Sequence, residues 1–207
     1  MIKIAIPKGR LGNKVYALLE KAGYACPELF SDNRKLIFEA ENGAVYFLAK
    51  PSDVARYVEY GAADIGFVGK DILLEEMPDI YEYMDLNIGK CRLMIASKAD
   101  YKEDTTRPLR VATKFPNIAY TYFLEKNREI EVIKLDGSIE LAPIVGLSDV
   151  ILDIVETGST LKENNMVILE EIVPVSTRMV ANKSSSKFLN DEIQLMVQRL
   201  KKVISND

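Results

Sequence analysis

Two carboxylates and three hydroxyls lie close together in residues 153–160, where the sequence reads Asp-Ile-Val-Glu-Thr-Gly-Ser-Thr. Carboxylates accept hydrogen bonds from sugar hydroxyls, whereas hydroxyls and backbone amides donate to phosphate oxygens. The glycine between them, Gly158, lets the backbone approach a ligand closely. This combination predicts a pocket for a sugar phosphate such as a ribose 5′-phosphate.

The flanking residues place this segment in a turn between a strand and a helix. Residues 149–155 are apolar enough for a buried strand, and residues 161–165 can open a short helix. The amides of residues 158–160 would then point along a helix N-terminus toward an anion. The turn is therefore expected to bind the phosphate of the ligand.

The hydroxyls and carboxylates of the turn have separate roles in this interpretation. No lysine follows the glycine as a P-loop requires, so neutral donors hold the phosphate. The hydroxyl donors are Thr157, Ser159 and Thr160, while Asp153 and Glu156 are free to accept from sugar hydroxyls. A helix cap built from ordinary turn residues is the alternative for the Thr-Gly-Ser-Thr segment.

A basic group follows the first predicted strand. Lys8, Gly9 and Arg10 come directly after the alternating residues 2–6. Ligands of α/β sheets bind at the carboxyl ends of strands, so this group is the best candidate for a second, basic wall of the site. Solvated turn residues are the alternative.

Polar residues also follow a strand predicted at 109–112. Thr113, Lys114 and Asn117 lie there, and Pro116 favours the start of a helix. We expect them as lower-ranking contacts of the same pocket.

Short strands alternate with helices along the chain, which predicts mainly parallel sheets. The pattern occurs as two successive sets, and each set forms an α/β domain. We expect strands at residues 2–6, 45–48, 64–68, 91–96, 109–112, 131–135 and 150–155, and helices at 13–22, 53–60 with Ser52 as cap, 116–126 and 139–145.

The last part of the chain is expected to return to the first domain. Residues 166–183 are apolar enough for strands that cross back, and residues 188–204 have a helical apolar face. Two α/β domains joined by two crossings, with a cleft between them, would result. The apolar face consists of Leu189, Ile193, Met196, Leu200 and Val203.

Composition excludes several classes of function. The 207 residues carry a net charge of -4 and no long Lys/Arg run, which argues against duplex nucleic acid as a partner. There is no histidine, so His-based acids, bases and metal sites are excluded.

Cys26 and Cys91 are far apart in the sequence and suggest neither a disulfide framework nor a zinc site; we expect both to be reduced and buried. No stretch is a secretory signal or reaches membrane-spanning length, so we expect a cytoplasmic protein with no membrane contact.

The sugar-phosphate turn belongs to a longer pattern that resembles the signature of the ATP phosphoribosyltransferase family. The segments 4–10 and 51–71 also resemble that family, so the similarity runs from the first residues to about residue 180. The matching positions of the signature are Glu140, Gly146, Ser148, Ile151, Asp153, Thr157, Gly158, Thr160 and Leu161.

The resemblance implies a fold and a reaction. The fold is similar to the type II periplasmic-binding-protein fold, with domain I near residues 1–89 plus 180–207 and domain II near 90–179. The reaction is that of a pentosyltransferase: adenine N1 of ATP attacks phosphoribosyl pyrophosphate and gives N1-(5-phosphoribosyl)-ATP and pyrophosphate, the first step of histidine biosynthesis. Mg²⁺ is expected to arrive with the pyrophosphate, so no protein metal site is expected.

The resemblance also implies residue roles. Asp153, Lys8 and Arg10 are the expected catalytic residues, and the turn from Asp153 and Glu156 to Thr160 binds the phosphoribosyl group. Lys50 stands where relatives carry arginine, which keeps the charge but loses the bidentate fork. The second wall is expected to comprise Lys8, Gly9, Arg10, Lys50, Asp71, Thr113 and Lys114, with helix capping as the alternative for Asp71 and with Asp64, Gly66 and Gly69 shaping its turn.

The chain resembles the short form of the family, which lacks a C-terminal regulatory domain. That form implies a regulatory subunit similar to histidyl-tRNA synthetase, in a hetero-oligomer that also contains a homodimer. Three alternatives remain open: a phosphoribosyltransferase for another base, a small-anion binding protein of the same fold, and a regulatory or scaffold role.

Overall fold

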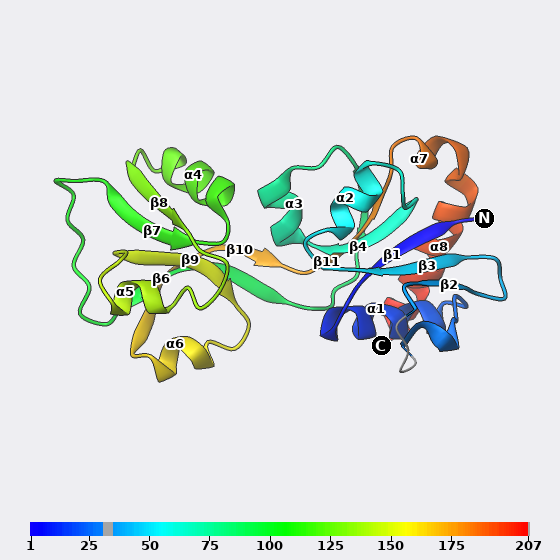
Figure 1. The fold of residues 1–207 in the computed structure, drawn as a ribbon, viewed down its shortest axis with the longest axis horizontal. Helices are drawn as coiled ribbons and strands as arrows, with labels where there is room; N and C mark the ends of the chain where they lie inside the picture. Colours follow the sequence, from blue (N-terminus) through cyan, green and yellow to red (C-terminus); the bar gives the residue numbers. More distant parts are fainter. Residues whose placement is uncertain (31–34, 207) are drawn as a thin grey trace. The chain divides into compact units, whose positions relative to one another are not determined.

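The computed structural model describes residues 1–30 and 35–206, and the chain divides into two compact units (Figure 1). Unit 1 comprises Met1–Leu73, Met77–Gly89 and Ser176–Asp207. Unit 2 comprises Leu74–Glu76 and Lys90–Val175. Each unit has its own sheet and its own helices, as the two sets of alternating strands and helices predict.

Unit 1 contains a six-stranded sheet with the order β2-β3-β1-β4-β11-β5. The three strands β1, β3 and β4 run parallel, so their carboxyl ends meet at one edge. At the edges of this group, β2 pairs antiparallel with β3 and β11 pairs antiparallel with β4, and β5 in turn pairs antiparallel with β11. The strands are β1 (Lys3–Pro7), β2 (Ile37–Glu39), β3 (Val45–Ala49), β4 (Ile65–Gly69), β5 (Tyr81–Asp85) and β11 (Thr177–Ala181).

Alternate residues of β1 enter different cores, which shows that the sheet of unit 1 is covered on both faces. Ile4 and Ile6 pack in the cluster that contains α1 (Arg10–Lys21) and α8 (Asn190–Asn206), whereas Ala5 packs with α2 (Val54–Glu59). This alternation follows from the twofold periodicity of a strand. The other helices of this unit are η1 (Pro27–Phe30), most of α3 (Lys70–Glu76) and α7 (Ser185–Phe188).

The apolar face expected at the end of the chain is confirmed in α8. Ile193, Met196 and Leu200 are fully buried, and Leu189 and Val203 pack against the same cluster. Helix α8 thus completes unit 1 although it is far from α1 in sequence.

The second crossing lies between Val175 and Ser176, a few residues before the position expected from the sequence. The reason is strand pairing, because all of β11 bonds to β4 and its residues from Arg178 onward also bond to β5. Residues 176–179 therefore belong with unit 1.

Unit 2 contains a five-stranded sheet with the order β10-β6-β9-β7-β8. The central strand β9 runs parallel to β7 and antiparallel to β6. The strands are β6 (Cys91–Lys98), β7 (Leu109–Thr113), β8 (Ile130–Lys134), β9 (Val150–Val155) and β10 (Met166–Val175), and the helices are α4 (Pro116–Glu125), α5 (Leu141–Ile144) and α6 (Ser159–Glu163).

The side chains of β9 also divide between two cores. Val150 and Leu152 pack with α4, whereas Ile151 and Val155 pack with residues of α5 and α6. Asp153 has the same parity as Ile151 and Val155, so it lies on the face that carries α5 and α6.

Some local expectations were wrong. Ser52 does not cap α2; its hydroxyl bonds to Asp53, which is the N-cap residue. Strands β2 and β5 were not expected, because their sequences have little apolar alternation. Neither Cys26 nor Cys91 forms a disulfide; Cys26 is buried as expected, whereas Cys91 is only half-buried. Within the described ranges, no helix is long and apolar enough to cross a bilayer.

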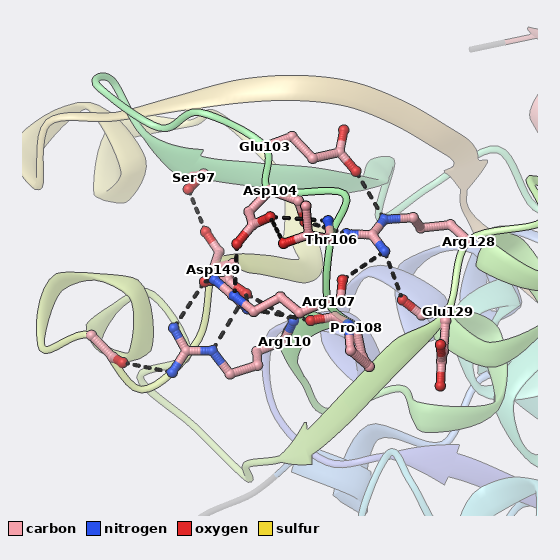
Figure 2. Close-up of polar contacts among 11 residues, drawn as sticks. Ser97, Glu103, Asp104, Thr106, Arg107, Pro108, Arg110, Arg128, Glu129 and Asp149 are labelled. Carbon is pink, nitrogen blue, oxygen red and sulfur yellow. Dashed lines mark hydrogen bonds and ion pairs between the residues drawn. The ribbon is translucent and has the colours of Figure 1, made fainter.

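A network of charged groups fixes the start of β9 (Figure 2). The carboxylate of Asp149 accepts two bonds from the Arg107 guanidinium, at 2.7 and 2.9 Å, and two from the Arg110 guanidinium, at 2.8 and 3.4 Å. It also accepts from the backbone N–H of Arg110 at 2.9 Å, while its carbonyl accepts from Ser97 at 2.6 Å. These bonds hold β9 in register between β7 and β6.

Replacing Asp149 with Asn should weaken the protein, because the amide leaves the two guanidinium groups without their anion. We expect a loss of about 1–3 kcal/mol in the free energy of unfolding at neutral pH, measured by urea titration. Hydrogen bonds from Arg107 and burial shift the pKa of Asp149 in opposite directions, and the result lies well below the ordinary 3.8. The contribution of Asp149 to the stability of the folded protein is therefore complete when the pH is above this ordinary pKa, and it disappears as the pH falls below it.

The matched control is Asp100→Asn, an exposed carboxylate in the turn after β6. An Asp149→Asn protein as stable as this control at neutral pH would contradict the role of the network.

Candidate functional site

The turn between β9 and α6 is a sharp reversal that needs glycine. Gly158 has φ 78° and ψ 5°, in the left-handed region that residues with a Cβ adopt rarely. Helix α6 then begins at Ser159, two residues before the expected start. The first amides of a helix have no acceptor four residues earlier, so those of Ser159 and Thr160 are donors at this turn, and that of Ser159 makes a long bond to the Thr157 hydroxyl at 3.4 Å.

The hydroxyls of the turn lie together at the surface. Thr157, Ser159 and Thr160 are all exposed. The hydroxyl of Thr157 is 3.1 Å from that of Ser159 and accepts the long bond from the Ser159 N–H. The capping alternative is thus partly present, while the exposed hydroxyls can still donate to an anion.

Asp153 lies near the end of strand β9, shortly before these donors in the sequence, and it is partly buried. One carboxylate oxygen accepts from the N–H of Ile154 at 2.8 Å. Burial raises the pKa of Asp153 to about 6, because desolvation disfavours the charged form more than the Ile154 bond favours it. Asp153 thus titrates close to neutral pH.

Two other charged side chains act on Asp153. Glu140, one residue before α5, raises its pKa further, whereas Lys114, directly after β7, lowers it. Lys114 is exposed and Glu140 is half-buried. Glu140 matches the family signature in the sequence, but it was not expected as a site residue. Its place in that signature was the signal that could have identified it.

Thr113 does not line the site. Its side chain is fully buried, and its hydroxyl donates to the carbonyl of Leu152 at 2.7 Å and accepts from the N–H of Phe115 at 2.8 Å. It therefore ties the end of β7 to β9 and has no capacity to meet a ligand. Asn117 is similarly engaged, because its amide donates to the carbonyl of Glu75 at 2.9 Å.

The basic residues of unit 1 gather at the carboxyl ends of its parallel strands. Lys8 follows β1 and Lys50 follows β3, and the N–H of Lys8 donates to the carbonyl of Ala49 at 2.8 Å. Gly9 has φ 86° and begins α1, which places Arg10 in its first turn. Lys8, Arg10 and Lys50 are exposed.

Gly12 explains how closely α1 sits on this edge. A Cβ at this position would lie 1.9 Å from the carbonyl oxygen of Pro7, so only glycine allows the first turn of α1 to pack over the end of β1. The direction of the basic segment 8–10, which lies between Pro7 and Gly12 in the sequence, depends on this contact.

Asp71 lies at the same edge, in the first turn of α3. The N-cap residue of that helix is Gly69, and a Cβ there would lie 2.1 Å from the Asp71 carboxylate, so this carboxylate lies close to the backbone at the start of the helix. Asp64, expected near this turn, is at the opposite end of β4. Its carboxylate accepts from the N–H of Lys3 at 2.8 Å and from the hydroxyl of Ser185 at 2.6 Å.

The expected site residues thus form two groups, one in each unit. The group of unit 2 combines donors with a carboxylate of raised pKa, and the group of unit 1 is mainly basic. Among the residues described, no three His, Cys, Asp or Glu side chains come close enough to hold a metal ion. The groups comprise Lys114, Asp153, Glu156, Thr157, Gly158, Ser159 and Thr160 in unit 2, and Lys8, Gly9, Arg10, Lys50 and Asp71 in unit 1.

Known proteins resemble this chain over its whole length. A protein named ATP phosphoribosyltransferase from Brachyspira hyodysenteriae is 58% identical over 206 residues, which cover 99% of this chain and 100% of that protein. One of the same name from Lachnoclostridium phytofermentans is 54% identical over 209 residues and covers 99% of this chain and 97% of that protein.

Solved structures agree with the fold. A chain of the ATP phosphoribosyl transferase (HisG:HisZ) complex from Thermotoga maritima has a TM-score of 0.87 at 39% identity, with 100% of both chains covered. The periplasmic aliphatic sulphonate binding protein SsuA from Escherichia coli has a TM-score of 0.63 at 13% identity, covering 99% of this chain and 68% of that one. The likeness to SsuA concerns the fold alone, and it confirms the expected periplasmic-binding-protein-like class.

The family model described as HisG, ATP phosphoribosyltransferase, matches residues 50–202, which include the complete β9–α6 turn and Lys50. Together with the two relatives, this match shows that the chain belongs to the ATP phosphoribosyltransferase family.

Proposed function

We propose that the chain binds phosphoribosyl pyrophosphate at the β9–α6 turn and transfers its phosphoribosyl group to N1 of ATP, the first step of histidine biosynthesis. The observation that carries this assignment is the placement of Asp153, with its raised pKa, next to a turn of exposed donors. A ribose phosphate needs both an acceptor for hydroxyls and donors for the phosphate.

The turn supplies the donors for the 5′-phosphate. Three hydroxyls and the first amides of α6 surround Gly158, and none of these groups carries a charge. A multidentate set of neutral donors holds a phosphate without attracting pyrophosphate to the same place as strongly as a lysine would.

Asp153 and Glu156 orient the ribose hydroxyls. An ionised carboxylate accepts at both oxygens, and a pKa of about 6 leaves Asp153 mostly ionised at neutral pH. Lys114 lies close enough to lower that pKa, which favours the ionised form. The ribose is thereby held with its anomeric carbon in a defined direction.

The reaction itself requires no strong base. The lone pair of adenine N1 forms a bond to the anomeric carbon, and the bond from that carbon to the pyrophosphate oxygen breaks with its electron pair. Alignment of two anionic substrates and stabilisation of the leaving charge account for the rate enhancement. Lys8, Arg10 and Lys50 of unit 1 face the other phosphates in this proposal, with Asp71 beside them.

Magnesium enters as part of the substrate. Mg²⁺ keeps several waters and binds phosphates readily, so it travels on the pyrophosphate group and neutralises part of its charge.

A partner subunit completes the enzyme in this proposal. The chain covers all of the Thermotoga maritima chain that was solved in a HisG:HisZ complex, which supports a hetero-oligomer. We propose that its partner is a subunit similar to histidyl-tRNA synthetase, that the chain also forms a homodimer, and that the enzyme acts in the cytoplasm.

The test of the activity is the ultraviolet absorbance change on ribosylation of adenine at N1. We expect a change with ATP, phosphoribosyl pyrophosphate and Mg²⁺ together, and none when either organic substrate is omitted. The rate should rise when the synthetase-like partner is added. A folded protein that gives no change in either condition, and binds phosphoribosyl pyrophosphate without turnover, would overturn the proposal in favour of a binding protein.

Asp153→Asn should lower kcat/KM for phosphoribosyl pyrophosphate by about 100-fold, because the amide no longer accepts from both ribose hydroxyls. The wild-type protein should also lose activity as the pH falls through about 6. The 5′-phosphate titrates in the same region, so the profile is compared with that of Asp153→Asn, which should lack the contribution of the enzyme. Unchanged activity would remove Asp153 from the site.

The same substitution should stabilise the free protein. The folded-state pKa of Asp153 is about 6 against an ordinary 3.8, so folding takes up a proton between these values and stability falls as the pH rises through them. Asn keeps the bond from Ile154 and never ionises. Well above pH 6 we expect Asp153→Asn to be more stable by about 2–3 kcal/mol in urea unfolding, with little difference below pH 4. Equal stability at every pH would show that Asp153 is not desolvated.

A further inference from the structure

Glu75 is a buried carboxylate that the proposed reaction does not use. It lies on the last turn of α3, in the short segment Leu74–Glu76 that belongs to unit 2, and only 9% of it is exposed. A buried carboxylate needs partners for its charge, and here these are backbone amides of α4.

Both carboxylate oxygens are engaged at the start of α4. One accepts from the N–H of Asn117 and the other from the N–H of Ile118, each at 3.1 Å. The side-chain amide of Asn117 returns a bond to the carbonyl of Glu75 at 2.9 Å. A negative charge at a helix N-terminus also interacts favourably with the helix dipole.

The amides from Phe115 to Ala119 are accounted for. Pro116 has no N–H, the N–H of Phe115 donates to Thr113, and the N–H of Ala119 donates to the carbonyl of Phe115. Glu75 supplies the acceptors for the two that remain, those of Asn117 and Ile118. Residues 113–118 are therefore held at one end by the bond from Thr113 of β7 to Leu152 of β9, and at the other end by Glu75.

Lys114 lies between these two anchors. Its side chain is exposed, while its neighbours Thr113 and Phe115 are buried. Lys114 is two residues after Ala112, so it lies on the same face of the sheet as Ala112. Asp153 lies on that face as well. The charge of Lys114 acts on Asp153, so its position matters to the site.

We infer that Glu75 is a positioning residue: its carboxylate fixes the first turn of α4 and thereby holds Lys114 beside Asp153. The kinetic part of this inference rests on the proposed function, because it takes phosphoribosyl pyrophosphate as the ligand of Asp153. The geometric part concerns the free protein alone.

The kinetic test compares Glu75→Gln with Lys114→Met in the enzyme assembled with its synthetase-like partner. Gln keeps the shape but offers one acceptor oxygen in place of two. Each variant should lower kcat/KM for phosphoribosyl pyrophosphate about tenfold, with KM for ATP changed less than about twofold, and the double variant should add nothing further. Glu125→Gln, the same change at the exposed far end of α4, should match the wild type. Additive effects, or equal effects on both substrates, would overturn the inference.

The second test does not require turnover. The carboxyl carbon of Asp153 is titrated by NMR in the free protein, and Asp153→Asn identifies its resonance. If Glu75 positions Lys114, Glu75→Gln raises the pKa of Asp153 by a few tenths of a unit, to the value seen in Lys114→Met. If Glu75 acts only through its own charge, removing that charge lowers the pKa instead, which would overturn the inference.

The two tests separate the possible failures. A raised pKa of Asp153 in both variants, with no transferase activity in any protein, would leave the positioning role intact and overturn the proposed function. An unchanged pKa in Glu75→Gln, with an intact amide fingerprint and full activity in the wild type, would overturn the positioning role and leave the function intact.

Discussion

The register of β9 is the constraint on which the site depends. A slip of one residue would turn Asp153 toward α4 and away from α5 and α6, because side chains alternate along a strand. The bonds of Asp149 to Arg107 and Arg110 at the start of the strand, and of Thr113 to the carbonyl of Leu152 near its end, exclude such a slip. Register is thus fixed at both ends by polar contacts that touch no ligand.

The two carboxylates of β9 show how one strand serves stability and binding together. Asp149 is surrounded by guanidinium groups, which hold its pKa well below the ordinary range, whereas burial raises that of Asp153. The first stabilises the folded chain and the second costs stability, because its charged form is desolvated. Such a cost is typical of residues that are arranged for a ligand and not for the fold.

The chemistry explains why a chain without histidine suffices. A neutral ring nitrogen is already a nucleophile, so the protein needs to align substrates and to place charge, and both tasks are within reach of hydroxyls, amides, carboxylates and lysines. Each unit presents its own group at the carboxyl ends of parallel strands, where loops are free to vary while the sheet stays fixed.

The sequence by itself determined the features that depend on neighbouring residues. The α/β alternation, the apolar face of α8, the strand β9 and the donor-rich turn around Gly158 all follow from local periodicity and turn chemistry. Tertiary structure alone decided which polar groups remain for a ligand. Thr113, Asn117 and Asp64 have the same kinds of polar group as the candidate site residues, but each of them bonds to a partner distant in sequence. The raised pKa of Asp153 and the anchoring of α4 by Glu75 likewise require desolvation and contacts between segments that are about forty or more residues apart. Such contacts carry no local signal, because they exist only after the strands have paired and the helices have packed.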